Sequence, residues 1–142
     1  MGEVAAGLAR RGFEAFARRD LETMVEFADP EIEINVVTAH VAGRDGPYRG
    51  HDGIRQYLDD VDATWDEIDL QPRQYVEIGD ERVLVLGRVR TRRGSTLIDV
   101  PNAWLWELAG GKVKSIRLFV DSESIASLLD ARDEALRSRP AG

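Results

Sequence analysis

An asparagine inside an apolar strand pattern is the first residue of this chain that suggests chemistry. Asn102 stands on the same alternating face as Val100, Trp104 and Trp106, in the segment "LIDVPNAWLWEL". An amide nitrogen can donate a hydrogen bond to a substrate oxygen, but an amide cannot take a proton from carbon at neutral pH. We therefore expect Asn102 to bind an oxygen atom of a ligand and not to act as a base.

A histidine and an aspartate follow predicted strands. His40 comes after the first predicted strand, in a loop near the expected pocket mouth, and histidine titrates near neutrality. His40 is a candidate catalytic acid or base, with a plain surface role as the alternative. Asp121 ends the last predicted strand and begins "DSES", a sequence typical of a helix N-cap.

Several other kinds of site are not indicated by the sequence. His40 and His51 do not have the three- or four-residue spacing of a helical metal pair. The chain has no cysteine, which excludes disulfides, thiolate catalysis and zinc–sulfur sites. It also has no glycine-rich phosphate loop and no serine–histidine–aspartate order. We expect no metal site and no cofactor.

The periodicity of apolar residues predicts an α+β domain. Asp20 and Asp52 are expected to cap the second and third helices. Four strands in the second half are separated by short turns, which predicts an antiparallel meander. The expected helices are 3–19, 21–28, 51–65 and 121–140, and the expected strands are 31–37, 68–78, 82–91, 95–108 and 112–120. We expect a single domain over residues 1–142, with helices over one face of the sheet and a pocket between the layers.

The same element order, together with four segments, resembles the nuclear transport factor 2-like superfamily. The segments are "FADPEIEI", "YRGHDGIRQYL", "GDERVLVLGRV" and "AWLWELAGGKVKSIRLFVD". Within that superfamily the chain is most similar to SnoaL-like and ketosteroid-isomerase-like proteins, over about residues 8–129. The resemblance implies a cone-shaped fold, in which a curved, mostly antiparallel sheet carries helices on its concave face. It leaves the activity open, because these domains host isomerases, cyclases, dehydratases, binding proteins and adaptors.

The resemblance also suggests roles for individual positions. A ketosteroid isomerase uses a carboxylate base, a tyrosine and a protonated aspartic acid. The matching positions here are Asn35, Phe13 and Asn102, so the steroid isomerase mechanism is not expected. Asp121 resembles an aspartate that SnoaL-like cyclases use as a general acid or base, with the helix cap as the alternative. Asn35 alternates with the apolar residues of its strand, which places it toward solvent or the pocket rim.

Aromatic side chains are expected to form the pocket walls. Trp65 is favoured for the pocket because it ends a predicted helix just before the first long strand. Packing in the core without ligand contact is the alternative for all of these rings. The expected ligand-binding residues are Phe13, Asn35, Tyr57, Trp65 and Trp104.

Composition and charge narrow the partners. The formal net charge of -7 argues against nucleic acid, which requires a basic surface. No segment approaches the roughly 18 consecutive apolar residues of a membrane span, and the first residues lack the pattern of a signal peptide. We therefore expect a cytoplasmic protein with no membrane partner. The resemblance implies a homodimer formed through the convex face of the sheet.

Two functions fit these observations. The first is a SnoaL-like enzyme of the isomerase, cyclase or dehydratase type, acting without a cofactor on a small, mostly apolar carbonyl compound. The second is a non-catalytic protein that binds such a small apolar molecule in the same pocket.

Overall fold

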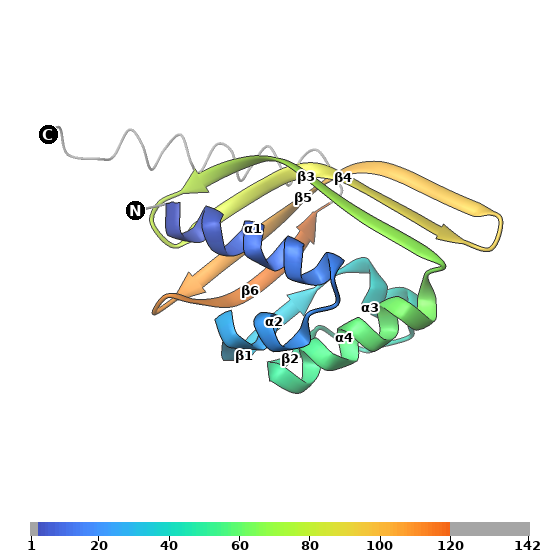
Figure 1. Cartoon of the computed structure of the whole chain (residues 1–142), viewed down its shortest axis with the longest axis horizontal. Coiled ribbons are helices and arrows are strands. Elements are labelled where there is room, and N and C mark those ends of the chain that lie inside the picture. The colour runs from blue at the N-terminus through green and yellow to red at the C-terminus, as the bar shows by residue number, and fades with distance from the viewer. Residues whose placement is uncertain (1–2, 120–142) are drawn as a thin grey trace, which may run out of the picture.

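Residues 3–119 are described by the structure, a computed structural model, as an α+β fold with a single sheet (Figure 1). The helices are α1 (Glu3–Ala17), α2 (Leu21–Phe27), α3 (Val37–Val41) and α4 (Gly50–Thr64). The strands are β1 (Ala28–Asn35), β2 (Tyr48–Arg49), β3 (Glu67–Ile78), β4 (Arg82–Arg93), β5 (Thr96–Ala109) and β6 (Lys112–Phe119). They form a six-stranded sheet in the order β2-β1-β6-β5-β4-β3. The fold class expected from the sequence is confirmed.

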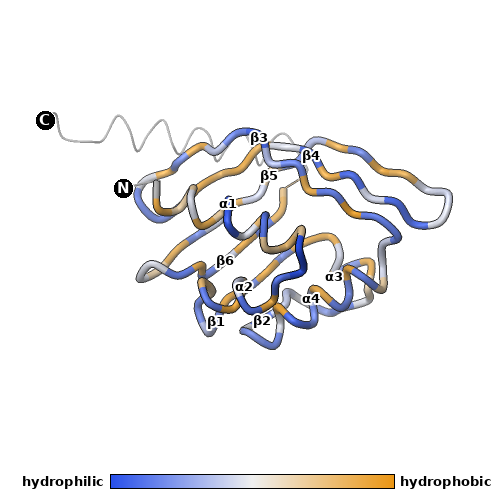
Figure 2. Tube along the Cα trace, in the orientation of Figure 1, coloured by the Kyte–Doolittle hydropathy of each residue, from blue (hydrophilic) through white to orange (hydrophobic). Residues whose placement is uncertain are grey.

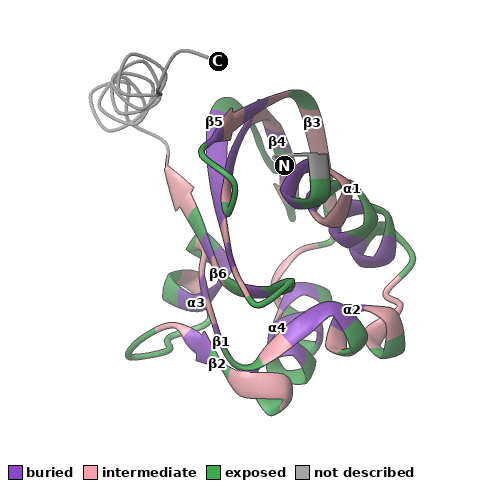
Figure 3. Ribbon diagram, turned by 90° about the vertical axis from the view of Figure 1, so that its left-hand side faces the viewer, coloured by how far each residue is buried: buried purple, intermediate pink, exposed green. Residues whose placement is uncertain are grey.

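The meander predicted for the second half of the chain is also confirmed. Strands β3 to β6 pair in sequence order, and each is antiparallel to the next. Gly79, Gly94 and Gly110 take positive φ angles in the three connecting turns, a conformation that glycine adopts without steric cost. The sheet curves around α1 (Figure 3).

Strand β1 makes the sheet mixed, because it pairs with β6 in parallel. The β1–β6 ladder is interrupted between the pair Ala28 and Val113 and the pair Glu33 and Ser115. The two-residue strand β2 pairs antiparallel with β1. The sheet is therefore open, with β2 at one edge and β3 at the other.

The two N-terminal helices follow directly from the sequence. Asp20 caps α2 as predicted, because its Oδ1 accepts a hydrogen bond from the Thr23 backbone nitrogen at 3.2 Å. The helix then ends at Ala28, two residues before Pro30, as the restriction on residues before proline requires. The apolar face of α1 is buried through Ala5, Ala9, Phe13 and Phe16.

Two local predictions were wrong. Residues 37–41 form the short helix α3, so His40 lies in its last turn and not in a loop. A helix of a single turn shows no periodicity by which the sequence could reveal it. Helix α4 begins after Arg49, which makes no side-chain cap bond, and Asp52 lies inside the first turn. The predicted last helix and Asp121 lie outside the described residues.

Alternation along the strands gives each face of the sheet its own buried cluster. Figure 2 shows the alternation of hydrophobic and hydrophilic residues along β3, β4 and β5. The concave face packs against α1, α2 and α4 through buried residues that include Val83, Val85, Trp104 and Trp106 (Figure 3). The other face carries a second buried cluster of Val76, Ile78, Leu84, Ala103 and Leu105. A ligand site between helices and sheet must therefore lie on the concave face.

Candidate functional site

An apolar cavity between α1 and the concave face of the sheet is the candidate ligand site. Its volume is about 40 Å³, enough for one or two water molecules. A larger ligand would require some of the wall side chains to move. Tyr57 carries the sole ionisable group among the described residues of this wall. The wall consists of Gly12, Phe13, Phe16, Met24, Ile34, Val36, Tyr57, Leu70, Trp104, Trp106 and Ile116.

Phe13 is the centre of the aromatic part of this wall. Its ring meets Trp104 edge to face, with 4.9 Å between centroids and an interplanar angle of 72°. The Trp106 ring lies 5.4 Å away on the same side. On the next turn of α1, the Phe16 ring stacks on Tyr57 at 5.5 Å. The helix thus closes the cavity with two rings, and Phe13 contacts both tryptophans of β5.

Asn102 is not one of the residues that line the cavity, but it lies two residues before Trp104, which does line it, on the same face of β5. Its side chain is buried at 3% exposure, and neither Oδ1 nor Nδ2 has a hydrogen-bond partner among the described residues. Its neighbour on β4 is Gly87, which has no side chain to offer. An unpaired buried amide costs about 1 to 3 kcal/mol, and such groups are rare in native proteins. The amide of Asn102 is therefore free to bind a ligand or a water molecule.

An open groove of about 460 Å³ adjoins the cavity between α1, α4 and β3. Phe13, Phe16 and Leu70 line both the groove and the cavity. Arg19 stands on the rim, where its Nε donates to Asp62 Oδ1 at 3.1 Å and its guanidinium lies 4.6 Å from the Phe16 ring centroid. The side chains of Phe13, Phe16 and Leu70 therefore stand between the groove and the cavity.

A hydrogen-bond network holds α4 against β2 behind the cavity wall. The Tyr48 hydroxyl donates to Asp60 Oδ2 at 2.7 Å, and Arg44 donates to both carboxylate oxygens of Asp60 at 2.7 and 3.0 Å. These hydrogen bonds, that of Arg44 first, lower the pKa of Asp60, while burial raises the pKa of Tyr48. The Tyr48 ring lies 5.3 Å from Tyr57 and so fixes the position of that cavity residue.

Burial also raises the pKa of Tyr57, and this predicts a pH dependence of stability. Unfolded tyrosine ionises near pH 10, so above that pH the unfolded chain loses a proton that the folded chain keeps. The free energy of unfolding should then fall by about 1.4 kcal/mol per pH unit for this residue. Tyr57→Phe should remove that part of the slope in denaturant titrations above pH 10. Tyr75→Phe is the control, because Tyr75 is half-buried and its replacement should change the slope of the free energy of unfolding against pH by less. Equal slopes for Tyr57→Phe and the native chain would contradict the prediction.

The structure brings together some of the residues predicted for the site. Phe13, Tyr57 and Trp104 lie in the cavity wall, whereas Asn102 shares the sheet face of Trp104 but does not line the cavity. Asn35 is half-buried and lies on the opposite side of β1 from Ile34, which does line the cavity.

Two further predicted residues lie away from the cavity wall. Trp65 is half-buried, and its Nε1 donates to Thr38 Oγ1 at 3.0 Å, so its polar edge already has a protein partner. His40 is exposed in the last turn of α3.

Several wall residues are absent from the ligand-binding residues expected from the sequence, although two of them carried a signal. Phe16 lies one helical turn after Phe13, and Trp106 lies two residues after Trp104, so periodicity places each pair on one face. Met24, Leu70 and other wall residues come from elements far apart in the chain and share no pattern with the rest. Their convergence depends on how the helices pack on the sheet.

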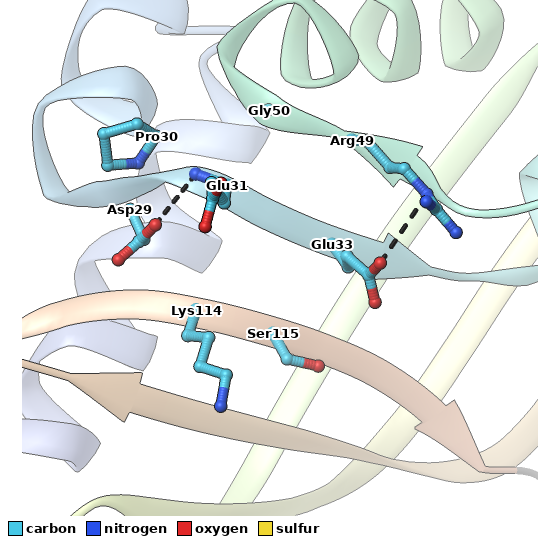
Figure 4. A pocket seen from close by; sticks show the side chains of 8 residues that line it. All are labelled: Asp29, Pro30, Glu31, Glu33, Arg49, Gly50, Lys114 and Ser115. Carbon is cyan, nitrogen blue, oxygen red and sulfur yellow. Dashed lines mark hydrogen bonds and ion pairs between the residues drawn. The ribbon is translucent and has the colours of Figure 1, made fainter.

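A larger surface hollow of about 630 Å³ lies on the outer side of β1 and β6 (Figure 4). Its charged groups face solvent, and several are paired within the hollow. Arg49 lies 3.6 Å from Glu33, and Asp29 Oδ1 accepts a hydrogen bond from the Glu31 backbone nitrogen at 2.8 Å. Exposed pairs of this kind contribute little binding energy, so the concave cavity is the better candidate.

Two other features are absent from residues 3–119. No group of three or more histidine, cysteine, aspartate or glutamate residues in that range is arranged to hold a metal ion. None of the helices in the same range combines the length and hydropathy needed to span a membrane.

Comparison with known sequences gives a family and close relatives. The sequence pattern of the SnoaL-like domain matches residues 9–116. Uncharacterized protein Rv0034 of Mycobacterium tuberculosis (strain H37Rv) is 30% identical over 113 residues, which are 79% of this chain and 85% of the relative. Uncharacterized protein Mb0035 of Mycobacterium bovis matches with the same identity and coverage.

Solved structures support the same fold. An NTF2-like protein of unknown function from Burkholderia pseudomallei superposes with a TM-score of 0.72 at 24% identity, covering 88% of this chain and 96% of its own. TerC, crystallised with polyporic acid, has a TM-score of 0.72 at 22% identity, covering 89% of this chain and 98% of its own. The nuclear transport factor 2-like fold expected from the sequence is confirmed. With the domain pattern covering residues 9–116, this chain belongs to the SnoaL-like domain family.

Proposed function

We propose that the chain binds a small, mostly apolar carbonyl compound in the concave cavity and acts on it without a cofactor. The activity would be of the isomerase, cyclase or dehydratase type. The observation that carries this proposal is the buried amide of Asn102, which has no partner among the described residues. A single substitution to leucine would remove the cost of burying this unpaired amide, about 1 to 3 kcal/mol. A ligand that pairs with the amide explains why asparagine is retained at this position.

The chemistry proposed for Asn102 is stabilisation of negative charge on the substrate oxygen. When a proton leaves the carbon next to a carbonyl, charge develops on the oxygen, and a preorganised amide donor in a dry site stabilises that charge. Asp121, which lies outside the described residues, is the group proposed to move the proton, since His40 is exposed on α3 and lies away from the cavity wall. Tyr57 stays protonated at neutral pH, because burial raises its pKa.

The cavity wall supports an apolar substrate. Apart from Tyr57 and the tryptophan nitrogens, the described wall offers no polar side-chain atoms, so a charged compound would lose its hydration there without compensation. The crystallisation of TerC with polyporic acid shows that another protein of this fold was studied with a small organic compound.

The proposal can be tested with 1-tetralone, a bicyclic ketone whose protons next to the carbonyl exchange with deuterium when an enol forms. The native chain should bind 1-tetralone in a calorimetric titration and accelerate the exchange in D₂O, followed by NMR. Asp121→Asn should slow the exchange and leave the affinity unchanged. Binding without faster exchange would support the non-catalytic function instead. If 1-tetralone, acetophenone and 2-acetylnaphthalene all fail to bind, the proposal is wrong.

Asn102→Leu should separate the ligand role of this residue from its role in folding. Because leucine removes an unpaired buried amide, the free energy of unfolding should rise by about 1 to 3 kcal/mol. The affinity for 1-tetralone should fall about tenfold, the effect of one lost hydrogen bond. Chemical denaturation and calorimetric titration measure the two effects.

The matched control is Asn35→Leu, the same substitution at a half-buried position on the outer side of β1. It should leave the affinity unchanged. Should Asn102→Leu lower the stability and bind 1-tetralone as tightly as the native chain, Asn102 is a structural residue.

A further inference from the structure

We infer that Trp106 is a second hydrogen-bond donor for the ligand, so that the ligand carries an acceptor at each end of an apolar body. The inference rests on the proposed function, because it defines the class of ligand for the same cavity. It adds a second polar contact, from a residue of the cavity wall, to the contact proposed for Asn102.

Trp106, like Asn102, is buried and carries a polar side-chain atom with no hydrogen-bond partner among the described residues. Its side chain is 4% exposed, it lines the cavity, and its Nε1 has no hydrogen-bond partner among the described residues. The ring is held in place by α1, because a Cβ atom at Gly12 would lie 2.4 Å from Trp106 Cη2. The chain pairs the indole nitrogen elsewhere, since Trp65 Nε1 donates to Thr38. The free donor at Trp106 is therefore not a general feature of tryptophan in this fold.

The spacing of the two unpaired groups defines the length of the ligand. Asn102 and Trp106 are four residues apart on one face of β5, so their Cα atoms are roughly 13 Å apart at about 3.3 Å per residue. Side chains on one face of a strand project in roughly the same direction, and a ligand that reaches both residues must lie over the Trp104 ring between them. With the Cα spacing taken as the spacing of the donors, two hydrogen bonds of about 3 Å each leave on the order of 7 Å between the ligand atoms that accept them. A single six-membered ring with a carbonyl group on opposite carbons has this length.

The donor chemistry defines the ligand ends. An indole nitrogen donates and never accepts, so the atom that meets Trp106 must be an acceptor. The Asn102 amide can donate or accept, and in the proposed function it donates to an oxygen. The apolar wall excludes a charged acceptor such as a carboxylate. The class that fits is a flat, uncharged aromatic compound with carbonyl oxygens at both ends.

A structural explanation makes a different prediction. If Trp106 serves packing alone, or if an ordered water in the cavity accepts from Nε1, the second carbonyl of a ligand gains nothing. The test therefore compares two compounds of nearly equal shape. 1,4-Diacetylbenzene has a carbonyl at each end, and 4-isopropylacetophenone replaces one of them with an apolar group of the same size.

In calorimetric titrations the native chain should bind 1,4-diacetylbenzene about tenfold more tightly than 4-isopropylacetophenone, the effect of one additional hydrogen bond. In Trp106→Phe the ratio of the two affinities should fall to about one. In Trp65→Phe, the matched control at a tryptophan outside the cavity wall whose Nε1 is paired with Thr38, the tenfold ratio should persist. The ratio compares two ligands on one protein, so a loss of stability in either variant cancels.

A measurement on the native chain makes the test independent of the variants. Saturating 1,4-diacetylbenzene should shift the ¹⁵N-resolved indole N–H signal of Trp106, and an unchanged signal at saturation would overturn the inference. Equal affinities for the two compounds would overturn it as well and leave the proposed function intact. If neither compound binds while 1-tetralone does, the inference fails alone. If 1-tetralone and the other two ketones also fail to bind, the proposed function fails with it.

Discussion

Phe13→Ala should lower the free energy of unfolding by about 3 to 5 kcal/mol, the usual cost of deleting a buried phenylalanine ring. Phe13 is 8% exposed and contacts both Trp104 and Trp106 through its ring. The adjacent tryptophan rings are held by their own packing, and Met24, the flexible side chain in the same wall, can fill only part of the space. The substitution should therefore leave a larger cavity and not a collapsed one.

The same change should improve ligand binding while it reduces stability. The present cavity of about 40 Å³ is smaller than any ketone with an aromatic ring, so the native chain must displace side chains to bind one. Alanine at position 13 removes that cost, and 1-tetralone should bind more tightly to Phe13→Ala than to the native chain. Denaturant titration and calorimetry measure the two effects on one preparation.

Phe27→Ala is the control for this prediction. Phe27 is a phenylalanine of α2 with 7% exposure, and it lies outside the cavity wall. Its replacement should cost a similar free energy of unfolding and leave the affinity unchanged. Equal affinities of the two variants would show that the cavity next to Phe13 is not where 1-tetralone binds.

The sequence predicts most of the fold because its signals are local. Alternation over long strands and short glycine turns specify the meander from β3 to β6, and the helical spacing of Ala9, Phe13 and Phe16 specifies the face of α1. The parallel pairing of β1 with β6 has no such signal, because it joins segments about 80 residues apart in sequence. Helix α3 is too short to show a period. Its position decides that His40 is exposed.

The site is less predictable than the fold, because it depends on which residues of neighbouring elements face each polar atom. Strand alternation shows that Asn102, Trp104 and Trp106 share a face. Whether a polar atom on that face has a partner depends on the neighbouring strand, and here the neighbour of Asn102 is a glycine. The case of Trp65 shows the converse, because its indole nitrogen is paired with Thr38 from a helix that the sequence did not reveal. Free and satisfied polar groups look the same in sequence.

Gly87→Ala should lower the free energy of unfolding by about 3 kcal/mol, at the upper end of the usual cost of overpacking. Gly87 pairs with Asn102 of β5 on one side and with Pro72 of β3 on the other. The register of β3 shifts between Pro72 and Gln74. A Cβ atom at position 87 would lie 2.1 Å from the Gln71 carbonyl oxygen, closer than any van der Waals contact allows. Because the clashing atom belongs to the backbone, a change of rotamer cannot relieve it.

The consequences for the site follow from the same geometry. To admit a methyl group, β3 must move away from β4, and the new methyl group stands next to Asn102 of β5, the cross-strand neighbour of position 87. Gly87→Ala should thus weaken 1-tetralone binding as well as stability. The matched control is Gly7→Ala in α1, where a Cβ atom meets nothing within 4 Å. There the same substitution should raise the free energy of unfolding by about 0.5 to 1 kcal/mol, because alanine favours the helix, and leave affinity unchanged. Equal stability changes at the two positions would mean that β3 does not cover Gly87 in this way.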